Sequence, residues 1–440
     1  MEREKVIIVG DSPASVSGLA YLALNLVHAF TMDGYDVTYI SITGPQFSEQ
    51  AVKKSYESFP HLIEACLASK VIDLSVRNPQ YITLLINTIH QSGAKLVVCV
   101  HDPWMLEGIR IAKQLLQSFV FGIYQTVEVP HYPRKVVTSG YMIKDNQIIG
   151  TNVASIEDTW KAADIIIPTT MLAQDAIAEY NANVFDAIYP GVDCIPEDEL
   201  KHISKRQLFD VDDDTIVLMS MGINRPRKAL DRLIMAFSEA YKRNNNMILY
   251  IHTDPTQEGG YDLITLSDEL GVRNKVLFDV RYRQGVGVSY KELCARYYHS
   301  DIYIGVPCGE GFGYGFAEAM FYGKPLIYSD YGCHVEICSG SGIAVPIVTT
   351  IHAMNSAIPW GLADVNGTAN AILTLAGNPE LREQYGRIGK NRIRGISWDK
   401  QAKMIVDAFI KVLEEKRNML RGGHNIIKSQ QENTKFRRII

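Results

Sequence analysis

The sequence predicts an α/β protein with parallel sheets, and two observations carry that prediction. Short apolar segments of strand length alternate with segments of helical apolar period along the chain, a pattern typical of parallel sheets covered by helices on both faces. A short turn-rich joint separates two such series of similar size. At about 150 residues per domain, 440 residues also favour two or three domains.

The first series begins with a strand over residues 5–9 and a loop of small residues over 11–18. A helix is expected over residues 19–30, stopped by Gly34. Further strands are expected over residues 37–42, 96–100, 119–122 and 165–167. Alternation over residues 135–150, around Lys144-Asp145-Asn146, predicts a hairpin excursion.

The turn Tyr189-Pro-Gly-Val-Asp193 marks the predicted domain boundary. The second series has strand candidates at residues 216–221, 247–252, 276–280, 302–306 and 325–328. We therefore predict one domain over residues 1–190, a second over 191–400, and a terminal segment over 401–440. Two similar α/β halves with one short joint indicate a cleft between them.

Composition excludes several classes of protein. A net charge of −5 argues against nucleic-acid binding as the main function. No apolar run approaches the ~18 residues that span a bilayer, and no signal-peptide pattern opens the sequence. Seven scattered cysteines fit a reducing compartment, so we expect a cytoplasmic protein. Residues 411–440 carry eight Lys and Arg against three Asp and Glu, so this basic tail could contact a membrane surface peripherally.

The most informative segment runs from Val306 to Pro325. A strand that ends at Pro307 is followed by glycines at 309, 311, 313 and 315, and then by helical residues 316–322. Gly323 stands where a helix-terminating glycine belongs. A helix that starts at the carboxyl end of a parallel strand favours an anion, typically phosphate, and glycine lets the backbone approach it closely.

Two glutamates flank this anion site. Glu310 lies in the loop, and Glu318 is expected in the first helical turn. Carboxylates suit hydroxyl groups better than they suit phosphate. Phosphates beside hydroxyl-rich rings describe a nucleotide sugar, which is the ligand that we expect.

These residues resemble a known family. Glu310-Gly-Phe-Gly with Glu318-Ala-Met looks like the E-x7-E signature of glycosyltransferase family 4, the retaining enzymes of the GT-B fold. Arg225-Pro-Arg-Lys228 resembles the family's Arg/Lys phosphate element, although Ile223 stands where many members have arginine. The turn at 189–193 and His101-Asp102-Pro103 are similar to further motifs, and their order agrees.

The resemblance implies two Rossmann-like domains, parallel sheets facing an interdomain cleft, and a role for each motif residue. Glu310 would contact the transferred sugar, and Glu318 the ribose. Lys228, with Arg225 or Arg227, would neutralise the diphosphate. The catalytic residues would be Glu310, His101 and Lys228, and the other donor contacts would come from Gly18, Gly311, Phe312 and Gly313. The domain over 1–190 would bind the acceptor, that over 191–400 the donor, and the last helix would cross back.

We therefore predict a retaining hexosyltransferase that uses GDP-mannose or a UDP-hexose and a glycan or lipid-linked acceptor. It would need no metal and no cofactor, because the cations and helix dipoles serve the diphosphate. The alternatives are an inactive partner-binding subunit and a GT-B phosphorylase or epimerase. A dinucleotide-dependent oxidoreductase fits poorly, because residues 10–18 lack G-x-G-x-x-G.

Overall fold

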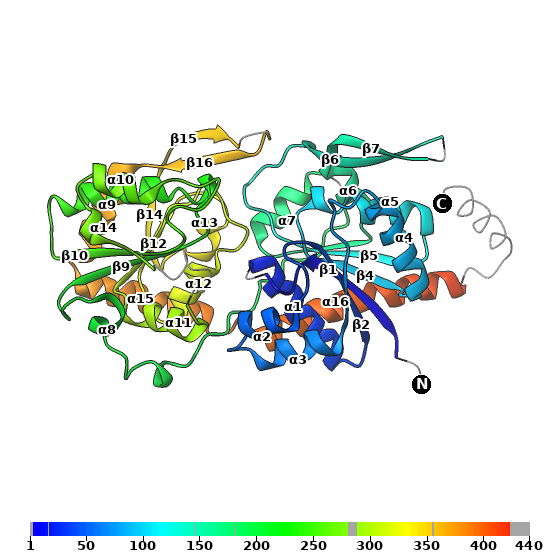
Figure 1. Ribbon diagram of the computed structural model, residues 1–440, viewed down its shortest axis with the longest axis horizontal. Helices are drawn as coiled ribbons and strands as arrows, with labels where there is room; N and C mark the ends of the chain where they lie inside the picture. The colour runs from blue at the N-terminus through cyan, green and yellow to red at the C-terminus, as the bar shows by residue number, and fades with distance from the viewer. Residues whose placement is uncertain are drawn as a thin grey trace.

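Two six-stranded parallel sheets, one from each half of the chain, organise the molecule (Figure 1). The computed structural model describes residues 3–15, 17–145, 147–180, 182–279, 288–353 and 356–422. The first sheet has the strand order β3-β2-β1-β4-β5-β8, and the second has β11-β10-β9-β12-β13-β14. The predicted α/β class with parallel sheets is confirmed.

The first sheet is parallel throughout and centres on β1, which pairs with both β2 and β4. Its strands are β1 (Lys5–Asp11), β2 (Asp36–Thr43), β3 (Lys70–Asp73), β4 (Leu96–Cys99), β5 (Val120–Gln125) and β8 (Ile165–Pro168). Its helices are α1 (Gly18–Met32), α2 (Glu49–Ser55), α3 (Pro60–Ala68), α4 (Tyr81–Ser92), α5 (Glu107–Leu116), α6 (Ile156–Ala162) and α7 (Met171–Ala178), with the 3-10 turn η1 (Pro103–Met105).

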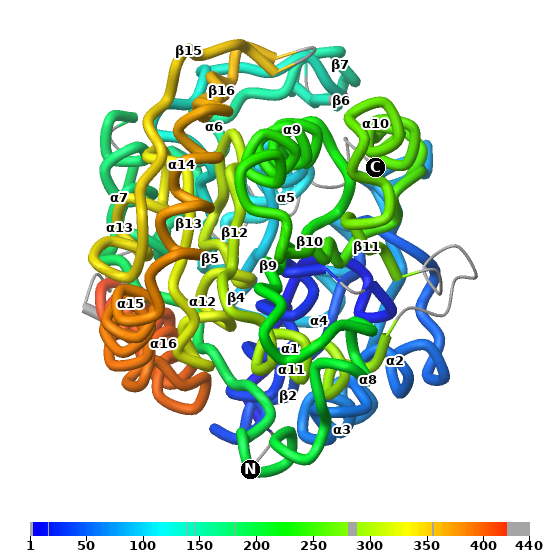
Figure 2. The backbone as a smooth tube through the Cα atoms, turned by 90° about the vertical axis from the view of Figure 1, so that its left-hand side faces the viewer, coloured from blue at the N-terminus to red at the C-terminus, as the bar shows by residue number. Residues whose placement is uncertain are grey.

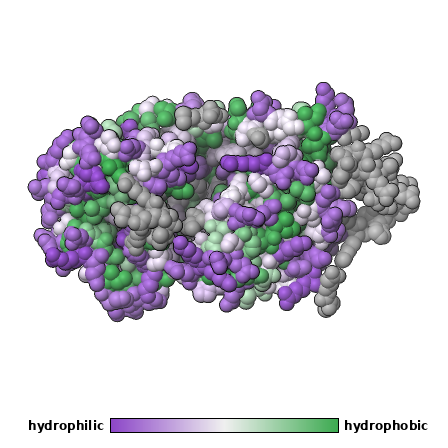
Figure 3. Space-filling model, in the orientation of Figure 1, coloured by the Kyte–Doolittle hydropathy of each residue, from purple (hydrophilic) through white to green (hydrophobic). Residues whose placement is uncertain are grey.

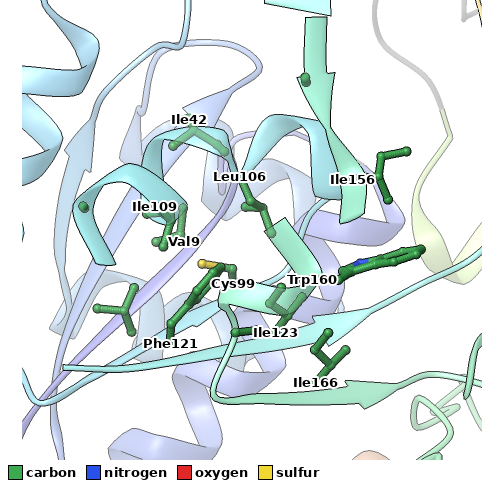
Figure 4. Packing of buried hydrophobic residues seen from close by; sticks show 14 of the residues in the cluster. Val9, Ile42, Cys99, Leu106, Ile109, Phe121, Ile123, Ile156, Trp160 and Ile166 are labelled. Carbon is green, nitrogen blue, oxygen red and sulfur yellow. The ribbon is translucent and has the colours of Figure 1, made fainter. Parts of the chain in front are cut away.

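Both faces of the first sheet are buried, because successive side chains of a strand point to opposite sides. Ile7 and Val9 join the core under α4 to α7, whereas Val6 and Ile8 join the core with α1, α3 and α16. Figure 4 shows the first of these cores, where Phe121 and Trp160 lie among aliphatic side chains. This two-sided burial explains the apolar character of the strand segments.

The second sheet repeats this plan. Its strands are β9 (Ile216–Met221), β10 (Met247–His252), β11 (Val276–Phe278), β12 (Ile302–Gly305), β13 (Leu326–Ser329) and β14 (Gly342–Val345). Its helices are α8 (Lys205–Phe209), α9 (Leu230–Tyr241), α10 (Leu263–Glu269), α11 (Tyr290–His299), α12 (Tyr314–Phe321), α13 (His334–Ile337), α14 (Val365–Ala376) and α15 (Pro379–Ile393). The 3-10 turns are η2 (Glu197–Glu199), η3 (Pro226–Lys228) and η4 (Arg273–Lys275).

Two antiparallel hairpins lie at one end of the molecule, at the top of both Figure 1 and Figure 2. The predicted hairpin is confirmed as β6 (Lys135–Lys144) and β7 (Gln147–Ser155), which extends five residues beyond its expected end at 150. The second hairpin, β15 (Ile347–His352) and β16 (Pro359–Ala363), was not predicted. Strands β3 and β14 were also missed, because they lie at sheet edges, are only partly buried and lack the apolar run of the central strands.

We call each sheet with its covering helices a lobe. Helix α16 (Trp398–Gly422) follows the second lobe in the chain and packs against α1 and β5 of the first. Gly122 of β5 makes room for it, since a Cβ there would lie 2.5 Å from the ring of Phe409. Lys416 forms an ion pair with Asp164, which precedes β8. The two sheets fall on either side of residue 190, but the domain division itself stays a prediction, and the basic tail beyond residue 422 lies outside the described residues.

Hydrophilic side chains cover much of the face in Figure 3, with apolar atoms interspersed. No helix in the described ranges is long and apolar enough to cross a membrane. What positions the site is the arrangement of the loops that follow the central strands of the two sheets.

Candidate active site

The glycine-rich loop connects β12 to α12, as the sequence predicts. Gly313 precedes the helix at a φ of 82°, and Gly323 follows it at a φ of 67°; both values favour glycine. Gly309 and Gly311 are required for another reason. A Cβ on Gly309 would lie 2.5 Å from the carbonyl oxygen of Glu128, and one on Gly311 would lie 2.8 Å from Thr126 Cβ. These two glycines therefore allow the loop after β5 to pack closely against the glycine-rich loop.

Glu310 of this loop is held by two cations from η3. Lys228 Nζ contacts its Oε1, and Arg227 Nη1 lies 3.2 Å from its Oε2. Burial raises the pKa of Glu310, but Lys228 and Arg227 outweigh burial and lower that pKa to about 2. The carboxylate is therefore ionised, and three of the predicted site residues come together.

Arg227 also reaches the other half of the chain. Its Nη2 lies 2.9 Å from Oε1 of Glu128, three residues beyond the end of β5. Burial raises the pKa of Glu128 to about 7, although Arg227 opposes the shift. Sequence reasoning missed Glu128. Its position just past a buried strand, at the edge where ligands bind, is the signal that could have found it.

Arg225 does not join this group. Its Nη1 donates to the main-chain carbonyl of Glu258 at 2.7 Å, and the residue is exposed. Of the two arginines that the sequence left as alternatives, only Arg227 contacts Glu310. Arg225 has an extended backbone just before η3, whereas Arg227 lies within that turn, and the two side chains have different partners.

Glu318 occupies a separate, buried position on α12. The helix begins at Tyr314, so Glu318 lies in its second turn and not in the first turn as expected. Its Oε1 accepts a hydrogen bond from the Tyr290 hydroxyl at 2.9 Å. Burial raises the pKa of Glu318 to about 7. The Tyr297 and Tyr290 hydroxyls favour the ionised carboxylate and oppose this shift, but burial has the larger effect. Oε2 is buried and has no hydrogen-bond partner among the described residues.

His101 lies in the first half of the chain and bonds within it. Its Nε2 lies 3.1 Å from Oδ1 of Asp11 and 3.0 Å from the hydroxyl of Thr43. Its Nδ1 accepts the backbone N–H of Asp102 at 2.8 Å. Both ring nitrogens are therefore engaged, and the structure does not bring His101 into contact with Glu310.

The remaining predicted residues lie around the glycine loop. Phe312 places its ring in the core of the second lobe, 5.3 Å from the ring of Tyr314, so only its main chain is free to bind a ligand. The carbonyl of Gly311 accepts from Thr169 at 3.4 Å. Gly18 is the first residue of α1 and lies beside Tyr314, whose ring carbon would lie 3.9 Å from a Cβ at Gly18.

In the described ranges, no group of three or more His, Cys, Asp or Glu side chains is placed to hold a metal ion.

Comparisons with known proteins support the fold and the class of the second half. Residues 202–392 match the family model described as glycosyl transferases group 1. That segment contains the whole second sheet, η3 and the glycine loop. The predicted enzyme class, a glycosyltransferase, agrees with this match. Among curated proteins, none matches the chain in sequence.

Solved structures resemble the chain over nearly its whole length. HepE of Anabaena, in complex with UDP and glucose, has a TM-score of 0.65 at 15% identity and covers 93% of this chain and 100% of its own. Sucrose-phosphate synthase of Thermosynechococcus elongatus has a TM-score of 0.66 at 16% identity, with 94% and 100% covered. The pneumococcal O-GlcNAc transferase GtfA, in complex with UDP and GlcNAc, has 0.63 at 12%, with 94% and 100% covered. The predicted GT-B fold is confirmed; placement in family 4 stays a prediction.

Proposed function

We propose that this protein is a glycosyltransferase that moves a hexose from a nucleotide-diphosphate sugar to an acceptor hydroxyl. The observation that carries the proposal is the contact of Arg227 and Lys228 with Glu310 beside the glycine loop. Two cations next to a helix start suit a diphosphate, and a carboxylate suits sugar hydroxyls. The match of residues 202–392 to glycosyl transferases group 1 supports this assignment.

Each residue in the proposal has a distinct role. Lys228 and Arg227 neutralise the leaving diphosphate, and Glu310 turns from them to the transferred sugar. Glu318 accepts hydrogen bonds from the ribose hydroxyls, and its unpartnered oxygen is available for that purpose. His101 acts on the reaction through Asp11 and the loop before α1, which it holds in place.

The donor class is proposed as a UDP-sugar before GDP-mannose, because HepE and GtfA are described in complex with UDP. The acceptor is a hydroxyl of a glycan or of a lipid-linked glycan. The transfer retains the anomeric configuration, as the resemblance to family 4 implies, and requires no metal, because Arg227 and Lys228 supply the positive charge.

A nucleotide panel tests the proposal. The full chain is mixed with UDP, GDP and ADP, and with UDP-glucose, UDP-GlcNAc and GDP-mannose, and its melting temperature is measured. We expect one nucleotide to raise it, with the same shift in EDTA. With the sugar donor so identified, NMR of the product reports the anomeric configuration. Failure of all six ligands at millimolar concentration would refute the proposed function.

A further inference from the structure

Arg227 lies between two carboxylates that come from the two halves of the chain. Nη1 faces Glu310 and the carbonyl of Gly309, and Nη2 faces Glu128. Each terminal nitrogen of the guanidinium is therefore already engaged. A diphosphate that uses this arginine has to displace at least one carboxylate.

Glu128 is the carboxylate that loses most when Arg227 turns away. Glu310 keeps Lys228, but Glu128 has no second cation within ion-pair distance in the described part of the chain. Its side chain is 27% exposed, so the ion pair is partly shielded from solvent. In such surroundings, a carboxylate that competes for Arg227 weakens the binding of another anion to that arginine.

We propose that Glu128 is a positioning residue that holds Arg227 in the donor-free protein and yields it to the donor's diphosphate. The inference rests on the proposed function and adds a control of the same site by the opposite half of the chain. Glu128 competes with the diphosphate, so donor affinity is lower than Arg227 and Lys228 alone would give. Release of Glu128 then links donor binding to the loop after β5 in the first half of the chain.

The proton balance follows from the charges that face Glu128. These groups are Arg227 and Lys228, which favour its ionised form, and Asp102, Glu310 and the Tyr132 hydroxyl. A bound diphosphate adds negative charge and removes Arg227, so it favours protonated Glu128. Protonation of Glu128 therefore contributes uptake of a proton to diphosphate binding, and this contribution weakens binding as the pH rises through the range in which Glu128 ionises in the donor-free protein.

Glu128→Gln isolates the charge from the packing. The main-chain carbonyl of Glu128 lies 2.5 Å from the Cβ position of Gly309 and 3.1 Å from that of Gly332, so the backbone carries the contact between the loops. Glutamine keeps the size and shape of the side chain. Glu179→Gln is a matched control, because Glu179 pairs with His131 on the exposed surface of the same half.

Calorimetric titration of the full-length proteins with UDP, GDP, ADP and pyrophosphate tests the inference between pH 6 and 8. For the nucleotide that the wild type binds, we expect Glu128→Gln to bind about 3–10-fold more tightly at pH 8, and we expect this advantage over the wild type to shrink toward pH 6. Glu179→Gln should match the wild type. In an Arg227→Gln background, adding Glu128→Gln should bring no gain.

Each other result has one meaning. Unchanged or weaker binding by Glu128→Gln, with a wild type that binds, overturns the inference and leaves the proposed function intact. A gain that persists in the Arg227→Gln background also overturns it, because the effect would not act through Arg227. If the wild type binds none of the four probes, the proposed function fails and the inference falls with it.

Discussion

The two sheets have the same strand order, yet the loops at their carboxyl ends differ in charge and in the residues that they contact. The central strand β1 ends at Asp11, whose oxygens form hydrogen bonds with Ser17, Thr43 and His101 within the same lobe. After the corresponding strand β9 come Arg227 and Lys228, which contact Glu310 of the neighbouring loop, and Arg227 also reaches Glu128 in the other half.

The comparison teaches that a position at a strand end does not by itself make a binding residue. In the first lobe, the polar side chains satisfy one another. In the second, Lys228 and Arg227 pair with Glu310 of the same half, and Arg227 also pairs with Glu128 of the opposite half. Identical topology supports both outcomes because function depends on the side chains of the loops.

Phe409→Ala should have the largest effect and should destabilise the first lobe more than the second. The substitution removes a side chain that the last helix contributes to the core of the first sheet. The ring is fully buried against Gly122, and loss of such a ring costs about 3–5 kcal/mol. We expect hydrogen exchange to accelerate in β5 and β8 more than in β9 and β12. The control is Lys411→Ala, at an exposed position of α16. Equal acceleration in both sheets would contradict the expectation.

Glu310→Gln tests whether the charge of a carboxylate in the second lobe contributes to the rate of transfer. It keeps the shape of the side chain but removes its charge, so kcat should fall by about 10²–10³ if the carboxylate supports positive charge on the sugar. Steady-state kinetics with the donor measures this, and circular dichroism checks the fold. Glu258→Gln, at an exposed carboxylate of the same half, should have no effect. Unchanged kcat in Glu310→Gln would remove it from the site.

Glu318 and Asp11 should give the two lobes opposite responses to pH. The pKa of Glu318 is raised by burial to about 7, so its contribution to stability is full below the unfolded value and declines as the pH rises toward 7. For Asp11, burial raises the pKa, but His101, Ser17 and Thr43 lower it to about 2, so its contribution is lost only in acid. Between pH 5 and 7.5, Glu318→Gln should abolish a decline in unfolding free energy of at most about 3 kcal/mol.

The same Glu318→Gln variant tests the ribose contact. Removing an interaction that is equal in ground state and transition state should raise the donor KM and leave kcat unchanged. Urea titrations at several pH values measure the stability, and initial rates measure KM. A stability curve parallel to that of the wild type would show that Glu318 is ionised throughout.

The smallest expected effect is a difference in donor affinity between two variants, Arg227→Gln and Arg225→Gln, whose positions are two residues apart. A charge-assisted bond to a diphosphate is worth roughly 1.5–3 kcal/mol, so Arg227→Gln should weaken donor binding about 10–150-fold. Arg225→Gln should stay within about twofold, because its guanidinium binds the Glu258 carbonyl. Equal losses in the two variants would refute the assignment of Arg227.

Local patterns in the sequence predicted local structure well. The ranges 216–221 and 247–252 coincide with β9 and β10, and Gly323 ends α12 as its spacing indicated. Contacts between distant segments were beyond reach. Glu128 meets Arg227 across 99 positions of sequence, and only the folded chain shows that pairing. The resemblance implied a catalytic role for His101, which stays a prediction; the hydrogen bonds of its ring to Asp11 and Thr43 could not be read from the sequence.

The return of α16 has a consequence for the order in which a ribosome completes the two lobes. The core of the first sheet includes Trp398, Ile405 and Phe409, so this wall is absent while the intervening lobe is being synthesised. At about 5–20 residues per second, translation from β8 to α16 takes roughly ten seconds or more. During that time the second lobe can close its own core, while the first exposes an apolar face that a chaperone could cover. Early synthesis and late completion thus fall on the same half of the molecule.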